Sequence, residues 1–161
     1  MKTELYKSIK GLDTSKLAEN DKEELLRFFM VTQNDLIRNQ IAFIFSDLKY
    51  EPAVPFIFEK INDKSLFNNN SSLVHALEDF DMKEYFIPLV KIAVEQEYES
   101  RLLAYGFVED LLPSISAAIK NDALEFLLLY RKEKEPMLTD RGKNSQWHFL
   151  ESTISLIQLA G

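Results

Sequence analysis

The chain of 161 residues contains no cysteine. Disulfide bonds, thiolate metal sites and a cysteine nucleophile are therefore excluded, and the absence suits a reducing cytoplasm. Only 4 glycine and 5 proline residues are present, which leaves little material for the tight turns of an all-β fold. The glycines are too few and too scattered to build a glycine-rich phosphate loop.

Long apolar runs are also absent. The longest, LRFFMV and LEFLLLY, have the size of core segments and fall far short of the roughly 18 residues that suggest a membrane-spanning helix. The opening stretch MKTELYKSIKGLDTSK lacks the apolar core of a signal peptide. We therefore expect a soluble, cytoplasmic protein that does not bind membranes.

Catalytic and metal-binding patterns are equally scarce. His75 and His148 are the only histidines, and no HExxH motif accompanies them. Glu78 and Asp79 are adjacent acids, but neighbouring residues on a helix point in different directions. No serine stands on a recognisable nucleophile elbow. We predict that the protein is not an enzyme and needs no metal or cofactor.

The charge of the chain is unevenly distributed. The net charge is −7, with 26 acidic and 19 basic residues. Residues 1–34 and residues 111–161 each carry six acids and six bases, so the whole excess lies in residues 35–110, with fourteen acids and seven bases. Such a segment is either a solvated surface or one that attracts a basic partner. In both cases it repels nucleic-acid phosphates.

One helical pattern occurs three times, in IAFIFSDL (41–48), LVHALEDF (73–80) and AYGFVEDL (104–111). In each, apolar residues fall at positions i, i+3, i+4 and i+7, as on the buried face of an amphipathic helix. The stripes are Ile41, Ile44, Phe45, Leu48; Leu73, Ala76, Leu77, Phe80; and Ala104, Phe107, Val108, Leu111. A unit that recurs about every 32 residues predicts a stacked helical-repeat array.

Prolines mark where a second helix of each pair begins. Pro55 follows the first pattern and Pro88 the second, at nearly matching distances. Pro113 comes much sooner after the third pattern, so the third pair is irregular. Its second helix is expected to be either lengthened or broken near Asn121.

An acid precedes the last apolar position of every pattern: Asp47, Asp79 and Asp110. An acid in the last turn of a helix opposes the helix dipole, so its recurrence suggests another use. We predict that these three are structural acids that accept hydrogen bonds from N–H groups at the start of the next helix. Direct contact with a partner is the alternative.

The stretch IRNQIAFIFSDLKYEPAVPFIFEKIND resembles a HEAT repeat of the short bacterial kind. The matching positions are Arg38, Ala42, Asp47 and the triplet Ala53-Val54-Pro55. The second unit keeps Asp79 and Pro88 but has Asn70 in place of the arginine, and the third keeps Arg101 and Asp110 without the proline. The likeness covers about residues 34–112 and implies an α-solenoid that binds proteins.

We therefore predict an all-α fold, a short right-handed α-solenoid of HEAT-like antiparallel helix pairs with capping helices. It would form a single domain over residues 1–161. Capping helices are expected in 1–33, repeats in 34–69, 70–99 and 100–135, and a loop and a C-terminal capping helix in 136–161.

The predicted function is that of an acidic protein-binding module, monomeric or weakly oligomeric, with a basic protein as its partner. In general character the chain resembles bacterial immunity proteins of contact-dependent toxin systems, which implies neutralisation of a nuclease-type toxin domain. The alternatives are a general HEAT-repeat scaffold and a HEAT-type lyase or glycosylase, although a glycosylase would need a basic concave surface. The predicted partner-binding residues are Glu51, Asp81, Glu84, Glu95, Glu97, Tyr98 and Glu99.

Overall fold

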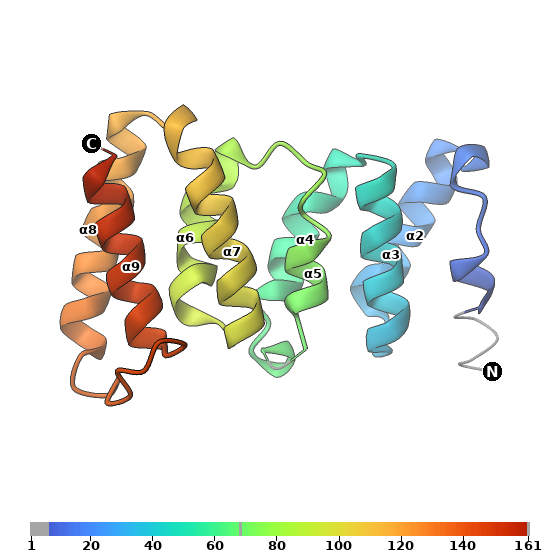
Figure 1. Ribbon diagram of the computed structural model, residues 1–161. Helices are drawn as coiled ribbons and strands as arrows, with labels where there is room; N and C mark the ends of the chain where they lie inside the picture. Colours follow the sequence, from blue (N-terminus) through green and yellow to red (C-terminus); the bar gives the residue numbers. More distant parts are fainter. Residues whose placement is uncertain (1–6, 68, 161) are drawn as a thin grey trace. The chain divides into compact units, whose positions relative to one another are not determined.

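The computed structural model describes residues 7–67 and 69–160, which form α-helices, short 3-10 helices and the turns between them (Figure 1). No β-strand occurs in these two ranges, so the prediction of an all-α fold is confirmed for them. The chain divides into two compact units, one ending at Phe80 and the other beginning at Asp81. The boundary falls inside the predicted repeat 70–99. No helix of the described ranges is long and apolar enough to cross a membrane.

Unit 1 packs α2 against α3, and α5 against both α3 and α4 (Figure 1). Its elements are η1 (Thr14–Lys16), α2 (Glu19–Val31), α3 (Asp35–Asp47), η2 (Glu51–Ala53), α4 (Val54–Ile61), η3 (Lys64–Leu66) and α5 (Ser71–His75). Pro55 is in the first turn of α4, where its missing N–H costs no helical hydrogen bond.

The first repeated pattern ends α3 with a Schellman motif. The N–H of Tyr50 donates to the Phe45 carbonyl and that of Lys49 to the Ser46 carbonyl, both at 2.9 Å. Lys49 takes the left-handed conformation, with φ 48°, and the Phe45 and Tyr50 rings lie 5.5 Å apart. These features satisfy the last carbonyls of the helix, while Ile41, Ile44 and Phe45 are buried on its inner face.

The second pattern is buried as predicted but is only partly α-helical. Leu73, Ala76, Leu77 and Phe80 are all buried, although α5 ends at His75. Beyond it the chain continues with i→i+3 bonds, from the Leu77 N–H to the Val74 carbonyl and from the Phe80 N–H to the Leu77 carbonyl. These tighter turns keep the helical sense, so Phe80 still reaches the core.

Unit 2 is built around α6, which packs against α7, α8 and α9 (Figure 1). Its elements are η4 (Lys83–Tyr85), α6 (Phe86–Glu95), α7 (Tyr98–Leu111), η5 (Leu112–Ser114), α8 (Ala117–Lys134) and α9 (Gln146–Leu159). Six of the ten residues of α6 are buried: Phe86, Leu89, Val90, Ile92, Ala93 and Val94. A helix that is apolar on most sides needs neighbours on most sides, and the three other helices supply them.

The third pair is lengthened rather than broken. Asn121 lies inside α8, which runs without interruption for 18 residues, and Pro113 lies in η5. Ser116 caps α8 through a 3.4 Å hydrogen bond from the Ile119 N–H to its hydroxyl oxygen. Of the third pattern, Ala104 and Val108 are fully buried, whereas Phe107 and Leu111 are half-buried.

Arg38 is the largest buried polar side chain of unit 1, at 2% exposure. Its Nη1 lies 2.9 Å from Oδ1 of Asp35. Its Nε and Nη2 have no hydrogen-bond partner within the described structure. Each buried donor left without a partner costs about 1–3 kcal/mol, so the single ion pair to Asp35 only partly offsets the burial of this charge.

Replacing Arg38 with methionine is therefore expected to leave the free energy of unfolding unchanged or to raise it by about 1 kcal/mol. Arg38→Ala should lower it by about 3 kcal/mol, because it leaves a cavity. Urea unfolding of both variants tests this, with Arg27→Met as a control at an exposed Arg–Glu pair. Equal, large losses for alanine and methionine would show that the charge itself is required.

Candidate functional site

All seven predicted partner-binding residues lie on the surface. Each one has an exposed side chain: Glu51, Asp81, Glu84, Glu95, Glu97, Tyr98 and Glu99. Glu51 belongs to unit 1 and the other six to unit 2. Exposure makes them accessible to a partner; the partner contact itself stays a prediction.

Within unit 2 these residues fall at the two ends of α6. Asp81 and Glu84 precede the helix, and the Asp81 carboxylate accepts a 3.2 Å hydrogen bond from the Lys83 N–H. Glu95 is the last residue of α6. Ten residues at about 1.5 Å rise per residue put roughly 15 Å between the two ends. The four residues Glu95, Glu97, Tyr98 and Glu99 therefore form one local group, the acidic junction.

The acidic junction spans the two-residue turn between α6 and α7. Gln96 caps α6 and is itself buried, which leaves the side chains on either side of it outside. Glu97 is the N-cap residue of α7 and Glu99 lies in its first turn, where negative charge is favourable against the helix dipole. Glu95 is exposed overall, but its carboxyl group is partly desolvated, and this raises the pKa of Glu95. The positive charges of Lys91 and Lys134 act in the opposite direction and lower it by less.

A polar contact holds the start of α9 against the acidic junction. Nε2 of Gln146 donates to the Val94 carbonyl at 2.6 Å and to the Tyr130 hydroxyl oxygen at 2.8 Å. Burial, with the nearby charges of Glu95 and Glu133, raises the pKa of Tyr130 to about 12. The bonds of Gln146 thus connect α6, α8 and α9 at the end of unit 2 that carries the acids.

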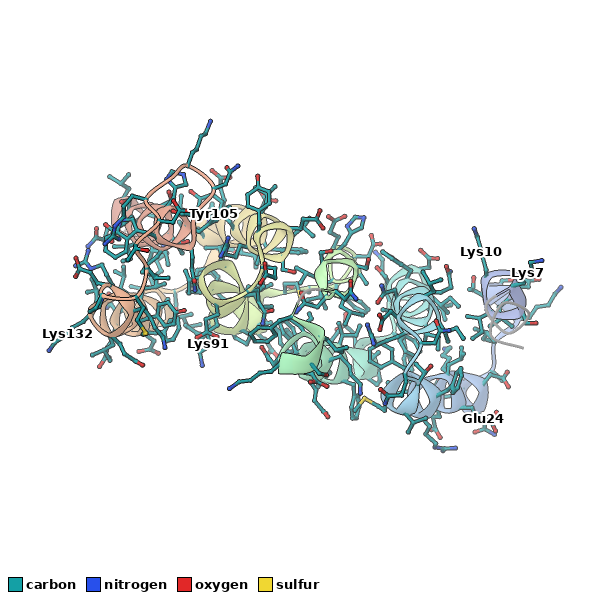
Figure 2. All side chains as sticks on the ribbon, turned by 90° about the horizontal axis from the view of Figure 1, so that it is seen from below. Lys7, Lys10, Glu24, Lys91, Tyr105 and Lys132 are labelled. Atoms are coloured by element: carbon teal, nitrogen blue, oxygen red, sulfur yellow. The ribbon has the colours of Figure 1, made fainter. Side chains whose placement is uncertain are left out.

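Beside the acidic junction lies an aromatic cleft with a volume of about 350 Å³. Its lining comes from α7, the loop before α9, and α9: Tyr98, Leu102, Tyr105, Lys143, Asn144, His148, Phe149 and Ser152. Figure 2 shows Tyr105 on the side of unit 2 formed by α7 and α9, with Lys91 and Lys132 on the side formed by α6 and α8. Tyr98 belongs both to the acidic junction and to the cleft.

Phe149 forms the floor of the aromatic cleft and is 7% exposed. Three rings meet it edge to face, with centroid distances of 6.0 Å from Tyr98, 6.0 Å from Tyr105 and 6.2 Å from His148. The Arg101 guanidinium lies 5.4 Å from the same ring, within the range of a cation–π contact. The floor is therefore fixed by packing on several sides.

The loop wall of the cleft is attached at two points. Nη2 of Arg101 donates to the Asn144 carbonyl at 3.3 Å, and the Arg141 guanidinium stacks 3.5 Å from the Trp147 ring centroid. Ser145 caps α9 by accepting a 3.1 Å hydrogen bond from the His148 N–H. The sequence predicted a loop before the C-terminal helix, and these contacts hold its last residues against the helices.

The three structural acids differ from one another. Asp79 accepts a 3.1 Å hydrogen bond from the Ser46 hydroxyl, which belongs to the helix of the preceding pattern. For Asp47 and Asp110, no hydrogen bond to the start of the following helix is found in the described ranges. The N–H groups there are satisfied differently, for example by Ser116 at α8. For all three acids, the predicted hydrogen bond from the start of the next helix stays a prediction.

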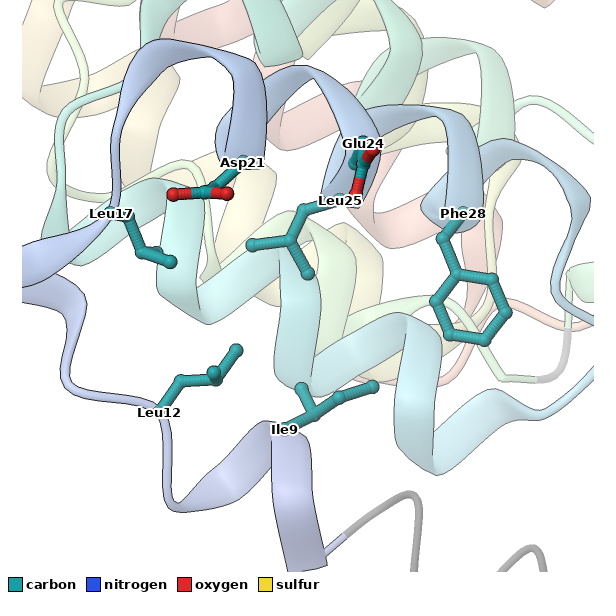
Figure 3. A pocket seen from close by; sticks show the side chains of 7 residues that line it. All are labelled: Ile9, Leu12, Leu17, Asp21, Glu24, Leu25 and Phe28. Carbon is teal, nitrogen blue, oxygen red and sulfur yellow. The ribbon is translucent and has the colours of Figure 1, made fainter.

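Unit 1 contains a different kind of hollow, between the N-terminal segment and α2 (Figure 3). Its volume is about 360 Å³ and its walls are mostly aliphatic: Ile9, Leu12, Leu17, Leu25 and Phe28, with Asp21 and Glu24 at the edge. Asp21 accepts a 2.8 Å hydrogen bond from the Ala18 N–H, so its carboxylate is engaged in starting α2. None of the predicted partner-binding residues lines this hollow.

Sequence reasoning missed most of the aromatic cleft. Only Tyr98 was predicted, whereas Phe149 and Lys143 come from segments more than forty residues away, with no local pattern linking them to α7. The group WHF was a weak signal, because aromatic residues at the start of an amphipathic helix commonly cover the preceding loop. Within the described residues, no group of three or more histidines and acids could hold a metal ion.

Comparison with protein families, with curated proteins and with solved structures gives no match to this chain. Functional inference therefore depends on the chemistry of the acidic junction and of the cleft beside it.

The Tyr130 environment predicts a distinctive alkaline titration. Because its pKa is raised to about 12 in the folded protein and is about 10 when unfolded, the unfolded state loses this proton first as the pH rises. Stability should therefore fall between about pH 10 and pH 12. In Tyr130→Phe this fall in the free energy of unfolding should vanish. The tyrosinate absorbance step that occurs at the highest pH should vanish with it.

Two measurements test this: the free energy of unfolding from urea unfolding across this pH range, and the tyrosinate absorbance over the same range. Tyr85→Phe is the control, because Tyr85 is a half-buried tyrosine at the opposite end of α6. An identical titration curve and pH dependence for Tyr130→Phe and the parent would contradict the assignment.

Proposed function

We propose that this protein is an acidic protein-binding module that captures a basic protein through the acidic junction of unit 2. In its sharper form, the partner is a cationic, nuclease-type toxin domain, and the chain is the immunity protein that neutralises it in the cytoplasm. The helices would stack as a short right-handed solenoid of HEAT-like pairs. The protein would act as a monomer or weak oligomer and would bind neither membranes nor nucleic acid.

The supporting observation is that the acids of the junction are exposed at the turn between α6 and α7. Glu95 and Glu97 have no ion-pair partner within 4 Å in the described structure, so binding would not first have to break an internal salt bridge. Carboxylates in such positions attract a cationic protein over several ångströms and raise its association rate.

The way such a module would inhibit a nuclease follows from charge. A nuclease holds its substrate through Lys and Arg side chains that neutralise phosphates. Carboxylates placed against those side chains would replace the phosphates and exclude them. Tyr98 would supply the apolar contact at the centre of the surface, since tyrosine is common among residues that contribute most to binding. Glu51, Asp81 and Glu84 would be additional contacts.

Reversing the charge of the junction is expected to abolish partner capture. The variant Glu95→Lys, Glu97→Lys, Glu99→Lys should retain the helical circular dichroism of the parent, because all three side chains are exposed. Its affinity for the basic protein that co-purifies with the parent chain should fall at least a hundredfold, since each desolvated charge pair contributes about 1.5 kcal/mol or more. Titration calorimetry at two salt concentrations measures this.

The matched control is Asp122→Lys, Glu125→Lys, Glu135→Lys, which changes the net charge of unit 2 by the same amount at exposed acids outside the predicted set. The control should keep most of its affinity. Equal losses of affinity in the two triple variants would show that only the net charge matters. That result would overturn the assignment of the binding surface to the acidic junction. Capture of many unrelated proteins by the parent chain would instead favour a general scaffold.

A further inference from the structure

An acidic surface does not by itself need an aromatic hollow at its edge. The aromatic cleft leaves Leu102 at 50% exposure and Tyr98 at 39%, on a helix whose other face is packed against α6. Exposed apolar side chains around a fixed aromatic floor are typical of a recognition pocket. The cleft is at the lower end of the size range of ligand sites, which suits one inserted side chain.

The walls of the cleft favour an aromatic occupant. The rings of Tyr98, Tyr105 and His148 already meet Phe149 edge to face. An incoming ring would extend this arrangement, and edge-to-face pairs of rings stabilise a complex beyond the effect of the area they bury. Polar groups at the wall, among them the Ser152 hydroxyl and the Asn144 side chain, can bind an indole or phenol group at its polar edge.

The charges around the cleft favour an occupant that has a basic residue next to it in its own chain. No acid lines the cleft, and Lys143 is the one lysine or arginine among its lining residues. Acids stand next to the lining: Glu97 and Glu99 flank Tyr98 in sequence, and the charge of Glu109 adds to the effect of burial in raising the pKa of Tyr105. A chain that inserts an aromatic side chain beside Tyr98 would therefore place its neighbouring residue against carboxylates, and that residue is best basic.

We propose that the aromatic cleft is an anchor pocket for an aromatic side chain, tryptophan or tyrosine, that has a lysine or arginine next to it in the partner protein. This inference rests on the proposed function, because it concerns the same cationic partner. It adds that the partner is recognised by an apolar anchor as well as by charge, which long-range electrostatic attraction alone does not provide.

Three capped peptides test the proposal on the full chain. They are acetyl-Lys-Lys-Trp-Lys-Lys-amide, the same peptide with glycine in place of tryptophan, and acetyl-Glu-Glu-Trp-Glu-Glu-amide. Amide chemical-shift titrations should show the first peptide perturbing residues 98–105 and 143–152. The glycine peptide should bind at least about tenfold more weakly, a difference of about 1.4 kcal/mol, and the acidic peptide should not bind there.

A matched pair of variants separates the anchor from the charge. Leu102→Ser removes an exposed leucine at the cleft, and Leu129→Ser removes one of similar exposure, 61%, on α8. Leu102→Ser should weaken the tryptophan peptide severalfold and leave the glycine peptide unchanged, whereas Leu129→Ser should change neither. Both positions are exposed, so the folding of unit 2 is expected to persist in each variant.

The outcomes distinguish the two proposals. Equal binding of the tryptophan and glycine peptides at the acidic junction overturns the anchor pocket while leaving capture by charge intact. Stronger binding of the acidic peptide overturns both, because it would make Lys143 the determinant. Shifts confined to the hollow of Figure 3, around Ile9 and Phe28, would place the apolar site elsewhere and also overturn the anchor pocket.

Discussion

The burial of α6 is the constraint on which unit 2 depends. Six of its ten residues are withdrawn from water, and three other helices pack against it to achieve this. At roughly 1.5–3 kcal/mol for each large apolar side chain buried, no other helix of the unit has as much to lose from exposure. Val94 lies inside and the next residue, Glu95, is exposed, so the side chains turn outward here apart from the buried Gln96. The acids that follow are therefore held outside by the same packing that stabilises the unit.

The polar and aromatic contacts at that end of α6 turn an exposed turn into a defined surface. Gln146 fixes the start of α9 to the Val94 carbonyl, and Phe149, one turn later in α9, then lies between Tyr98 and Tyr105 of α7. Arg101 contacts both the Phe149 ring and the loop that carries Lys143. Charge, apolar surface and a fixed loop thus meet within one end of unit 2. An acidic segment without this support would be a solvated face with no preferred partner geometry.

The sequence pattern was sufficient for the helices but insufficient for their ends and for the cleft. The apolar spacing predicted the whole buried face of the second pattern and most of the other two, in which Leu48, Phe107 and Leu111 are half-buried. It failed to show that α5 ends at His75, since i→i+3 turns bury Phe80 as well as an α-helix would. The division at Phe80 lies inside one predicted repeat and has no local signal. The exposed acids were predictable from their charge, whereas Phe149 and Lys143 approach α7 only through tertiary packing.

The central claim is that the acidic junction and the aromatic cleft form one partner-binding surface on unit 2. Hydrogen exchange of the full chain, alone and saturated with its captured basic partner, tests this most directly. Amides in the first turns of α7, in residues 143–145 and at the start of α9 should become protected, while those of α2 should exchange at the same rate in both samples. Protection confined to α2 and the other helices of unit 1, with α7 and α9 unchanged, would contradict the account.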